Sequence, residues 1–350
     1  MSDSQHLLDI IHPYQVISII GMMKNVGKTT VLNYIIKKLW NTHLLGLTSI
    51  GRDGELEDIV SCTPKPRIYV KKGTYLATAK KCYYNCDITK EIIETSGIYT
   101  SMGEVIIVRA LSDGYVELGG PSIVSYLSKI TANLKELGCD KILIDGAVSR
   151  KTFATPIISD ATLLCTGAEL SLDMNKVVRE TCHIVNLFSL NHIKNQKLIR
   201  LIKSTLENSK LAIIFSNFSY KIINVKTSLD SAKLVSENLT EKVKYILIRG
   251  VLTDTFLEEL MKTTDQYKDL VIIVEDATKL FIGEKTLKVF QRKGGNLRVI
   301  NEINLIGIVL NPFSPSAGFK FDKYKFLKLA EKKINLPVFD IKLIEEAKTN

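Results

Sequence analysis

Short aliphatic runs recur along the chain, and most are separated by amphipathic, helix-like stretches. Each run ends in glycine, serine, aspartate or asparagine, which are typical of turns. Continuous apolar runs that alternate with helices indicate parallel strands buried on both faces. The pattern therefore predicts an α/β fold, a mostly parallel sheet flanked by helices, with ligands at the carboxyl ends of the strands. The predicted strands lie in 16–20, 44–50, 141–146, 161–167, 211–217, 244–250, 269–276 and 304–311.

The stretch 104–118 departs from this pattern, because two strand-like runs flank Ser112-Asp113-Gly114. A turn-forming tripeptide between two apolar runs predicts a β-hairpin. A hairpin here interrupts the strand–helix alternation, so we assign it to an insertion over about 55–138.

The domain organisation is predicted from where the nucleotide-type motifs end, because no low-complexity segment or long linker divides the chain. We expect a nucleotide-binding domain over 1–168 that contains this insertion. A second α/β region over 169–300 follows. The last strand–helix segment, 301–350, is expected to return to the first domain.

The segment "GMMKNVGKTT", residues 21–30, follows a predicted strand and opens an amphipathic helix. A phosphate-binding loop needs small residues that let backbone N–H groups face the anion, a helix that begins there, and a lysine for the terminal phosphates. An ordinary strand-to-helix turn explains only the Gly-Lys-Thr. We therefore predict a nucleotide site with a Mg²⁺-binding hydroxyl at Thr29. Its candidate residues are Gly21, Lys24, Asn25, Val26, Gly27, Lys28, Thr29 and Thr30.

Two aspartates are candidates for catalysis beside this loop. Asp145 ends an apolar strand and is followed by glycine, a Walker B pattern in which the carboxylate holds Mg²⁺ directly or through water. Asp53 stands in a Gly-Arg-Asp-Gly turn after the second strand. It faces either the metal ion and the attacking group or only solvent, and the residues alone favour neither. No N-K-x-D motif occurs, so ATP is expected rather than GTP.

Composition restricts the classes of function. The net charge of +10 arises from 47 basic and 37 acidic residues. The lysines are scattered and do not interleave with aromatic residues, which favours a solvated surface over nucleic-acid binding. No apolar run reaches the length of a membrane span, and the N-terminus lacks the pattern of a signal peptide. With six unevenly spaced cysteines, which suit reduced thiols, we expect a cytoplasmic protein.

Cys82 and Cys86 have a C-x₃-C spacing without a second Cys or His pair nearby. Two ordinary thiols are therefore favoured over a metal site. The five histidines form no ligand-like group, and His183 is expected to be structural. No Ser-His-Asp order is recognised, so any hydrolysis is expected to be phosphoryl transfer to water.

The five residues between Gly21 and Gly27 make the loop resemble that of dethiobiotin synthetase and cobyric acid synthase-type proteins, a branch of the P-loop NTPases. The resemblance implies a P-loop NTPase sheet, and it allows a homodimer. It also implies an extra phosphate contact from within the loop, which we assign to Lys24, because Met23 occupies the position of the branch's signature lysine. Asn311 is similar to an asparagine that contacts the base in these relatives.

A closer resemblance rests on longer strings, namely "GMMKNVGKTT", "SIGRDGE", "KPRIYVKKGTYLATA", "MGEVIIVRALSDGYVELGGPS", "IDGAVSRKTFA" and "SDATLLCTGA". They are similar to the small subunit of the reactivase of lysine 5,6-aminomutase and related adenosylcobalamin-dependent aminomutases. The resemblance is densest over 16–170. It implies an ATPase that releases damaged cobalamin from the mutase, together with a second subunit related to mismatch-repair ATPases.

In this hypothesis the γ-phosphate orders loops around Asp53 and Lys24, and the segment "RALSDGY" contacts partners. Two alternatives remain. One is a small-molecule ATP-dependent ligase or kinase of the dethiobiotin synthetase type. The other is a nucleotide-binding regulator that does not hydrolyse ATP.

Overall fold

The protein is described by a computed structural model over residues 3–51, 67–146, 158–204, 206, 209–224 and 231–347. Two compact units divide the chain. Unit 1 comprises Met1–Cys182 and Asn304–Asn350, and unit 2 comprises His183–Ile303. The division lies within helix α5 (Met174–Phe188), and each unit has its own sheet.

Unit 1 contains a nine-stranded sheet in the order β20-β17-β9-β1-β8-β2-β4-β6-β5. The neighbours from β20 to β4 are all parallel, whereas β6 and β5 are joined by antiparallel pairing. The strands are β1 Val16–Gly21, β2 Leu45–Ser49, β4 Tyr75–Ala79, β5 Lys90–Thr100, β6 Gly103–Ala110, β8 Lys141–Asp145, β9 Ala161–Gly167, β17 Leu305–Asn311 and β20 Val338–Asp340.

Alternating side chains of these strands supply two separate cores. Ile17, Ile19 and Leu143 belong to a cluster that also contains side chains of α1, α2 and α11. Ile142 and Ile144 belong to a second cluster, with side chains of α4. Burial on both faces explains the continuous apolar runs in the sequence. The helices of the unit are α1 Asp3–Ile11, α2 Lys28–Leu39, α3 Lys80–Tyr84, α4 Val124–Glu136, α10 Lys323–Lys333 and α11 Ile341–Glu346.

The predicted hairpin around Ser112-Asp113-Gly114 is wrong, because its second run does not pair with its first. β7 (Gly114–Val116) pairs with β3 (Ile68–Val70), and the antiparallel neighbours of β6 are β4 and β5. Asp113 accepts a hydrogen bond from the backbone N–H of Lys72 at 2.9 Å and also contacts the Lys71 ammonium. These contacts direct the chain after β6 towards β3.

Residues 304–350 contribute to unit 1. β17 lies parallel to β9, and β20 is the outer strand beside β17. Between them a short hairpin is formed by β18 (Phe313–Ser314) and β19 (Phe319–Lys320), which pair antiparallel. The carboxyl end of β17 thereby lies next to that of β9, where the candidate site is found.

Unit 2 contains a five-stranded sheet in the order β11-β10-β12-β14-β16. The strands β12, β14 and β16 are parallel, but β10 pairs antiparallel with β12. The expectation of a parallel strand at 211–217 is therefore wrong, since burial on both faces makes a run apolar whatever its direction. The elements are α6 Gln196–Ser204, β10 Leu211–Phe215, β11 Tyr220–Ile222, α7 Ala232–Asn238, β12 Val243–Ile248, β13 Leu252–Thr253, α8 Asp254–Thr263, η3 Gln266–Asp269, β14 Val271–Val274, η4 Ala277–Lys279, β15 Leu280–Phe281, α9 Glu284–Arg292 and β16 Asn296–Val299.

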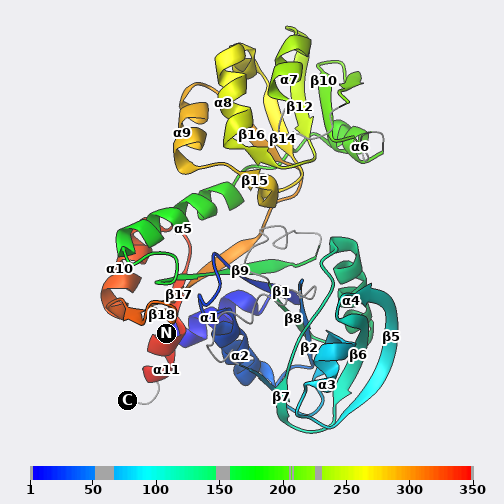
Figure 1. Ribbon diagram of the computed structural model, residues 1–350, viewed down its shortest axis with the longest axis vertical. Helices are drawn as coiled ribbons and strands as arrows, with labels where there is room; N and C mark the ends of the chain where they lie inside the picture. The colour runs from blue at the N-terminus through cyan, green and yellow to red at the C-terminus, as the bar shows by residue number, and fades with distance from the viewer. Residues whose placement is uncertain are drawn as a thin grey trace. The chain divides into compact units, whose positions relative to one another are not determined.

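The predicted α/β class with a large, mostly parallel sheet flanked by helices is confirmed (Figure 1). Among the helices of the described residues, none combines the length and the apolar character that crossing a bilayer requires.

Asp340 caps the N-terminus of α11 from the end of β20. Its Oδ1 accepts hydrogen bonds from the backbone N–H groups of Lys342 at 2.9 Å and Leu343 at 3.2 Å. Its Oδ2 is buried without a hydrogen-bond partner among the described residues. Burial raises the pKa of this carboxyl above its usual value, although both backbone N–H groups oppose the shift.

Asp340→Asn should make the thermal stability of unit 1 less dependent on pH. A raised folded-state pKa contributes stability that is fully present below the unfolded-state pKa and is lost as pH rises through the folded-state pKa. We therefore expect the variant's unfolding midpoint, relative to that of the parent, to rise by roughly 2–4 °C between pH 3.5 and pH 7.5. Calorimetry at a series of pH values measures this difference.

Asp322→Asn is the matched control, because Asp322 caps α10 by accepting from the N–H of Lys325 at 2.8 Å but is exposed. If the unfolding midpoint of Asp340→Asn changes with pH as that of the parent does, burial does not perturb the pKa of this carboxyl.

Candidate functional site

The candidate loop lies at the point where the order of the parallel strands reverses. β1 is flanked by β8 on one side and β9 on the other, with Ile19 opposite Asp145 and Gly21 opposite Cys165. In open α/β sheets, ligands bind outside the carboxyl ends of strands at such a point. The sheet therefore brings the loop after β1, Asp145 and the end of β9 to one edge.

Three residues set the shape of the loop between β1 and α2. Asn25 and Gly27 have left-handed backbone conformations, with φ of 59° and 89°. A Cβ at Gly21 would lie 2.7 Å from Cγ2 of Val26 and 3.0 Å from Cδ of Lys28. Glycine at position 21 thus lets the loop fold back over the strand end, which a phosphate cradle requires.

Lys28 is the first residue of α2 and is half-buried beneath the loop. Its ammonium donates to the carbonyl of Met23 at 3.4 Å. Burial lowers the pKa of Lys28, the carboxylate of Asp145 acts to raise it, and the charge of Lys24 acts to lower it further. The predicted residues Lys24, Lys28 and Asp145 therefore interact electrostatically in the folded chain.

The two threonines that follow differ in exposure. Thr29 is half-buried, whereas Thr30 is exposed and lines a shallow pocket on α2 and α11 with Asn33, Tyr34, Lys37 and Glu345. Asp53, the other predicted acid, and its neighbour Arg52 lie outside the described residues. Among the described residues, the predicted acid is Asp145, whose carboxylate acts on the charge of Lys28.

Asn311 lies beside the loop, at the end of β17. Its Nδ2 donates to the carbonyl oxygen of Asn25 at 2.9 Å, and its Oδ1 accepts from the N–H of Phe313 at 3.2 Å. A Cβ at Gly27 would be 3.3 Å from Cβ of Asn311, and a Cβ at Gly167 would be 2.1 Å from the Asn311 carbonyl oxygen. The side chain of Asn311 is thus held between the loop and the end of β9.

Glu169, two residues beyond β9, was not predicted as a site residue. Its carboxylate accepts hydrogen bonds from Asn25 Nδ2 at 3.4 Å and from Ser314 Oγ at 2.6 Å. It also accepts from the hydroxyl and the N–H of Ser316. Burial alone would raise the pKa of Glu169, but these hydrogen bonds hold it below its usual value. No motif pointed to this glutamate, because its partners are distant in sequence.

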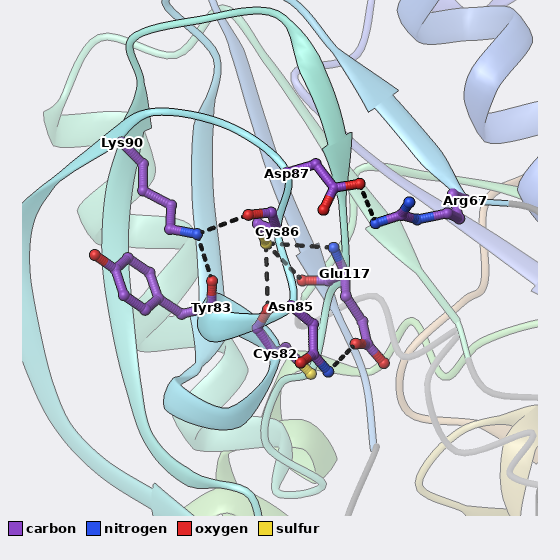
Figure 2. Close-up of polar contacts among 8 residues, drawn as sticks. All are labelled: Arg67, Cys82, Tyr83, Asn85, Cys86, Asp87, Lys90 and Glu117. Carbon is purple, nitrogen blue, oxygen red and sulfur yellow. Dashed lines mark hydrogen bonds and ion pairs between the residues drawn. The ribbon is translucent and has the colours of Figure 1, made fainter.

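Cys82 and Cys86 form a separate group with structural hydrogen bonds (Figure 2). The thiol of Cys86 donates to the carbonyl of Cys82 at 3.2 Å, and its sulfur accepts from the N–H of Glu117 at 3.4 Å. Both side chains are buried, and burial raises the pKa of the Cys86 thiol. Within the described part of the chain, no three His, Cys, Asp or Glu side chains gather as metal ligands.

Lysine and backbone contacts complete this group around helix α3. Figure 2 shows the ammonium of Lys90 between the carbonyls of Tyr83 and Cys86, at 2.6 and 3.0 Å. Carbonyls near a helix C-terminus lack partners within the helix, so a lysine there stabilises them. The C-x₃-C pair therefore belongs to the packing of α3 and the turn after it against the segment that follows β7.

Comparison of the chain with protein-family models finds no match, and comparison with curated proteins finds no relative at a significant level.

Gly167→Ala should destabilise unit 1, because the added methyl group would overlap the backbone carbonyl of Asn311, which cannot rotate away as a side chain can. We expect a loss of about 1–3 kcal/mol in the free energy of unfolding, as for other overpacked sites. Urea unfolding followed by circular dichroism measures it.

Gly283→Ala is the control, since a Cβ there lies 3.4 Å from its nearest neighbour, a carboxylate oxygen of Asp254, at a φ of −74°. Because Gly283 is the N-cap of α9, where alanine is less favourable than glycine, the loss of cap stability offsets the gain in backbone entropy, and this variant should change the free energy of unfolding by less than about 1 kcal/mol. Equal stability of the Gly167 variant and the parent would contradict the close approach of β9 and β17.

Proposed function

We propose that this site binds ATP with Mg²⁺ and that the chain is a P-loop NTPase. The observation that carries the proposal is Lys28 at the first turn of α2, beneath a loop with two left-handed residues and interacting with Asp145. A helix N-terminus, backbone N–H groups and a lysine together suit a polyphosphate. The half-buried acid distinguishes this loop from a simple anion site, because it suits a divalent cation.

Each residue has a distinct part in this proposal. Lys28 would exchange its contact with the Met23 carbonyl for a phosphate oxygen, and exposed Lys24 would add a second positive charge. The Thr29 hydroxyl and the Asp145 carboxylate would hold Mg²⁺. The metal ion, when bound, would neutralise charge that develops on the phosphates.

A chain of contacts leads from the loop helix to the surface proposed for partners. Asn33 of α2 donates to the carbonyl of Arg67 at 2.9 Å and accepts from the N–H of Tyr69 at 3.1 Å, as a neighbouring strand would. Tyr69 lies opposite Tyr115 in the β3–β7 pair. A shift of α2 on nucleotide binding would therefore displace β3 and β7.

Within "RALSDGY", Asp113 and Tyr115 are exposed, and Tyr115 is the large aromatic side chain of the two. Arg109 forms an ion pair with Glu91 at 2.7 Å, and Asp113 binds Lys71. Tyr115 is 44% exposed, with the Arg67 guanidinium 5.3 Å from its ring centroid. Aromatic and arginine side chains are the commonest anchors of protein interfaces.

The chain is proposed to act as the small subunit of an aminomutase reactivase, with a second ATPase subunit related to mismatch-repair proteins. In this proposal ATP binding and hydrolysis change the loop and α2, and the β3–β7 surface transmits the change to the mutase, which releases damaged cobalamin. The support is the sequence resemblance together with the contacts between α2 and β3.

Lys28→Ala should weaken ATP binding by about tenfold or more, since it removes a half-buried charge-assisted contact. Isothermal titration with ATP–Mg²⁺ measures the affinity. Asp145→Asn is the contrasting variant, because it keeps the shape of the side chain but lacks the charge that Mg²⁺ prefers. It should retain ATP binding and lose Mg²⁺-dependent hydrolysis. Unchanged ATP affinity of the Lys28 variant would exclude the loop as the nucleotide site.

Reactivation of a mutase should require this chain. Inactivated aminomutase, fresh adenosylcobalamin, ATP–Mg²⁺ and both subunits are combined, and recovered mutase activity is compared with and without the chain. We expect recovery only with both subunits, and faster ATP hydrolysis by the complete mixture than by the isolated chain. Equal recovery without the chain would favour the ligase or kinase of the dethiobiotin synthetase type.

Tyr115→Ala tests the partner surface in the same mixture. It should reduce recovery and leave ATP affinity unchanged, because Tyr115 does not belong to the loop. Tyr99→Ala is the matched control, as Tyr99 is 73% exposed on β5. Equal loss in the two variants would argue against a role specific to the β3–β7 surface.

A further inference from the structure

We infer that Asn311 and Glu169 are positioning residues that hold the phosphate loop in its binding conformation through Asn25. These three residues are called the loop clamp below. The clamp also joins the loop to the β18–β19 hairpin. Its consequence for nucleotides rests on the proposed function, whereas its effect on the loop itself does not.

Asn25 is the residue of the loop that most needs support. Its φ of 59° is left-handed, a conformation that costs free energy for a residue with a side chain. Both its backbone and its side chain are held from outside the loop. The carbonyl accepts from Asn311 Nδ2 at 2.9 Å, and Nδ2 donates to Glu169 at 3.4 Å.

Asn311 is fixed from both sides. The end of β9 approaches so closely that only glycine fits at position 167, and the backbone N–H of Ala168 donates to the Asn311 carbonyl at 3.0 Å. Oδ1 of Asn311 meanwhile accepts from Phe313. Asn311 is therefore a rigid part of the sheet edge, and the loop is held against it.

Glu169 makes the second contact that fixes the loop, through the side chain of Asn25. Besides Asn25, the described residues that donate hydrogen bonds to it are Ser314 and Ser316 of the hairpin segment. Hydrogen bonds to a carboxylate are stronger than those between neutral groups. The one carboxylate thus connects the loop after β1, the end of β9 and the β18–β19 hairpin.

A preformed loop binds phosphate without first losing conformational entropy. This role differs from base recognition, for which Asn311 was a candidate. A base-reading amide would favour ATP over inorganic polyphosphate, and its loss would spare the latter. A clamp acts on the loop, so its loss weakens every polyphosphate ligand by the same factor.

The first experiment measures the loop without any ligand. Hydrogen exchange of the segment 22–31 is followed by mass spectrometry in the parent, Asn311→Ala, Glu169→Ala and Asn25→Gly. Loss of one hydrogen bond should speed exchange about three- to tenfold in the first two variants. Asn25→Gly keeps the carbonyl that accepts from Asn311 and favours the left-handed backbone, but it loses the side-chain hydrogen bond to Glu169. The exchange rate of its loop should therefore rise only by the amount that the loss of this one hydrogen bond causes.

Asn304→Ala and Glu180→Gln are the matched controls. Asn304 lies before the other end of β17, where its Nδ2 donates to the Asp160 carbonyl at 2.8 Å, and Glu180 forms an exposed ion pair on α5. Both should exchange as the parent does in the loop segment. Parent-like exchange in the Asn311 and Glu169 variants would overturn the clamp.

The second experiment compares ATP, GTP and inorganic tripolyphosphate as ligands. Asn311→Ala should weaken all three about three- to tenfold. Loss confined to ATP would overturn the clamp in favour of base reading. If the parent binds none of the three ligands, the proposed nucleotide function fails, and the exchange experiment still decides whether the clamp exists.

The hairpin connection is tested with Ser314→Ala combined with Ser316→Ala. Among the described residues, neither serine has a hydrogen bond to the loop, so faster exchange in 22–31 would show that Glu169 transmits the effect. Glu169→Gln should fall between the parent and Glu169→Ala, because it keeps one carbonyl acceptor. Loop exchange that is unchanged in the double variant would exclude the hairpin from the clamp.

Discussion

The candidate site depends on how closely the ends of β9 and β17 approach each other. Gly167 permits this approach, and it places the Asn311 side chain against the loop residue Gly27. The backbone of Asn25 is then bonded to a fixed sheet edge. A larger residue at 167 would separate the two strands and withdraw that support. The shape of the loop after β1 thus depends on how β9 packs against β17, which lies two strands away from β1 in the sheet.

Much of the fold could be predicted, because burial on both faces of a parallel sheet leaves a strong trace in the sequence. Each of the eight apolar runs overlaps a strand, from β1 to β17. The loop was visible as well, because glycines at 21 and 27 satisfy local steric needs. Local chemistry therefore predicted these elements and the position of Lys28 at the start of α2.

Pairing and support could not be predicted in the same way, because they depend on contacts between distant residues. The apolar pattern of β10 does not encode its antiparallel direction, and the turn at Asp113 leads towards β3 instead of back along β6. The contact from Glu169 to Ser314 spans 145 positions. A glutamate that follows a strand has no local feature that distinguishes it from a solvated side chain.

The contact between Asn25 and Asn311 joins residues 286 positions apart, with all of unit 2 inserted between them. During synthesis on the ribosome, unit 2 is complete before β17 has been made. The contiguous chain of unit 2 can fold first, whereas the loop of unit 1 lacks its contact with Asn311 until β17 has been made. A nascent chain would thus acquire its finished site only after β17 has been synthesised, and until then the edge of β9 that pairs with β17 lacks this partner strand.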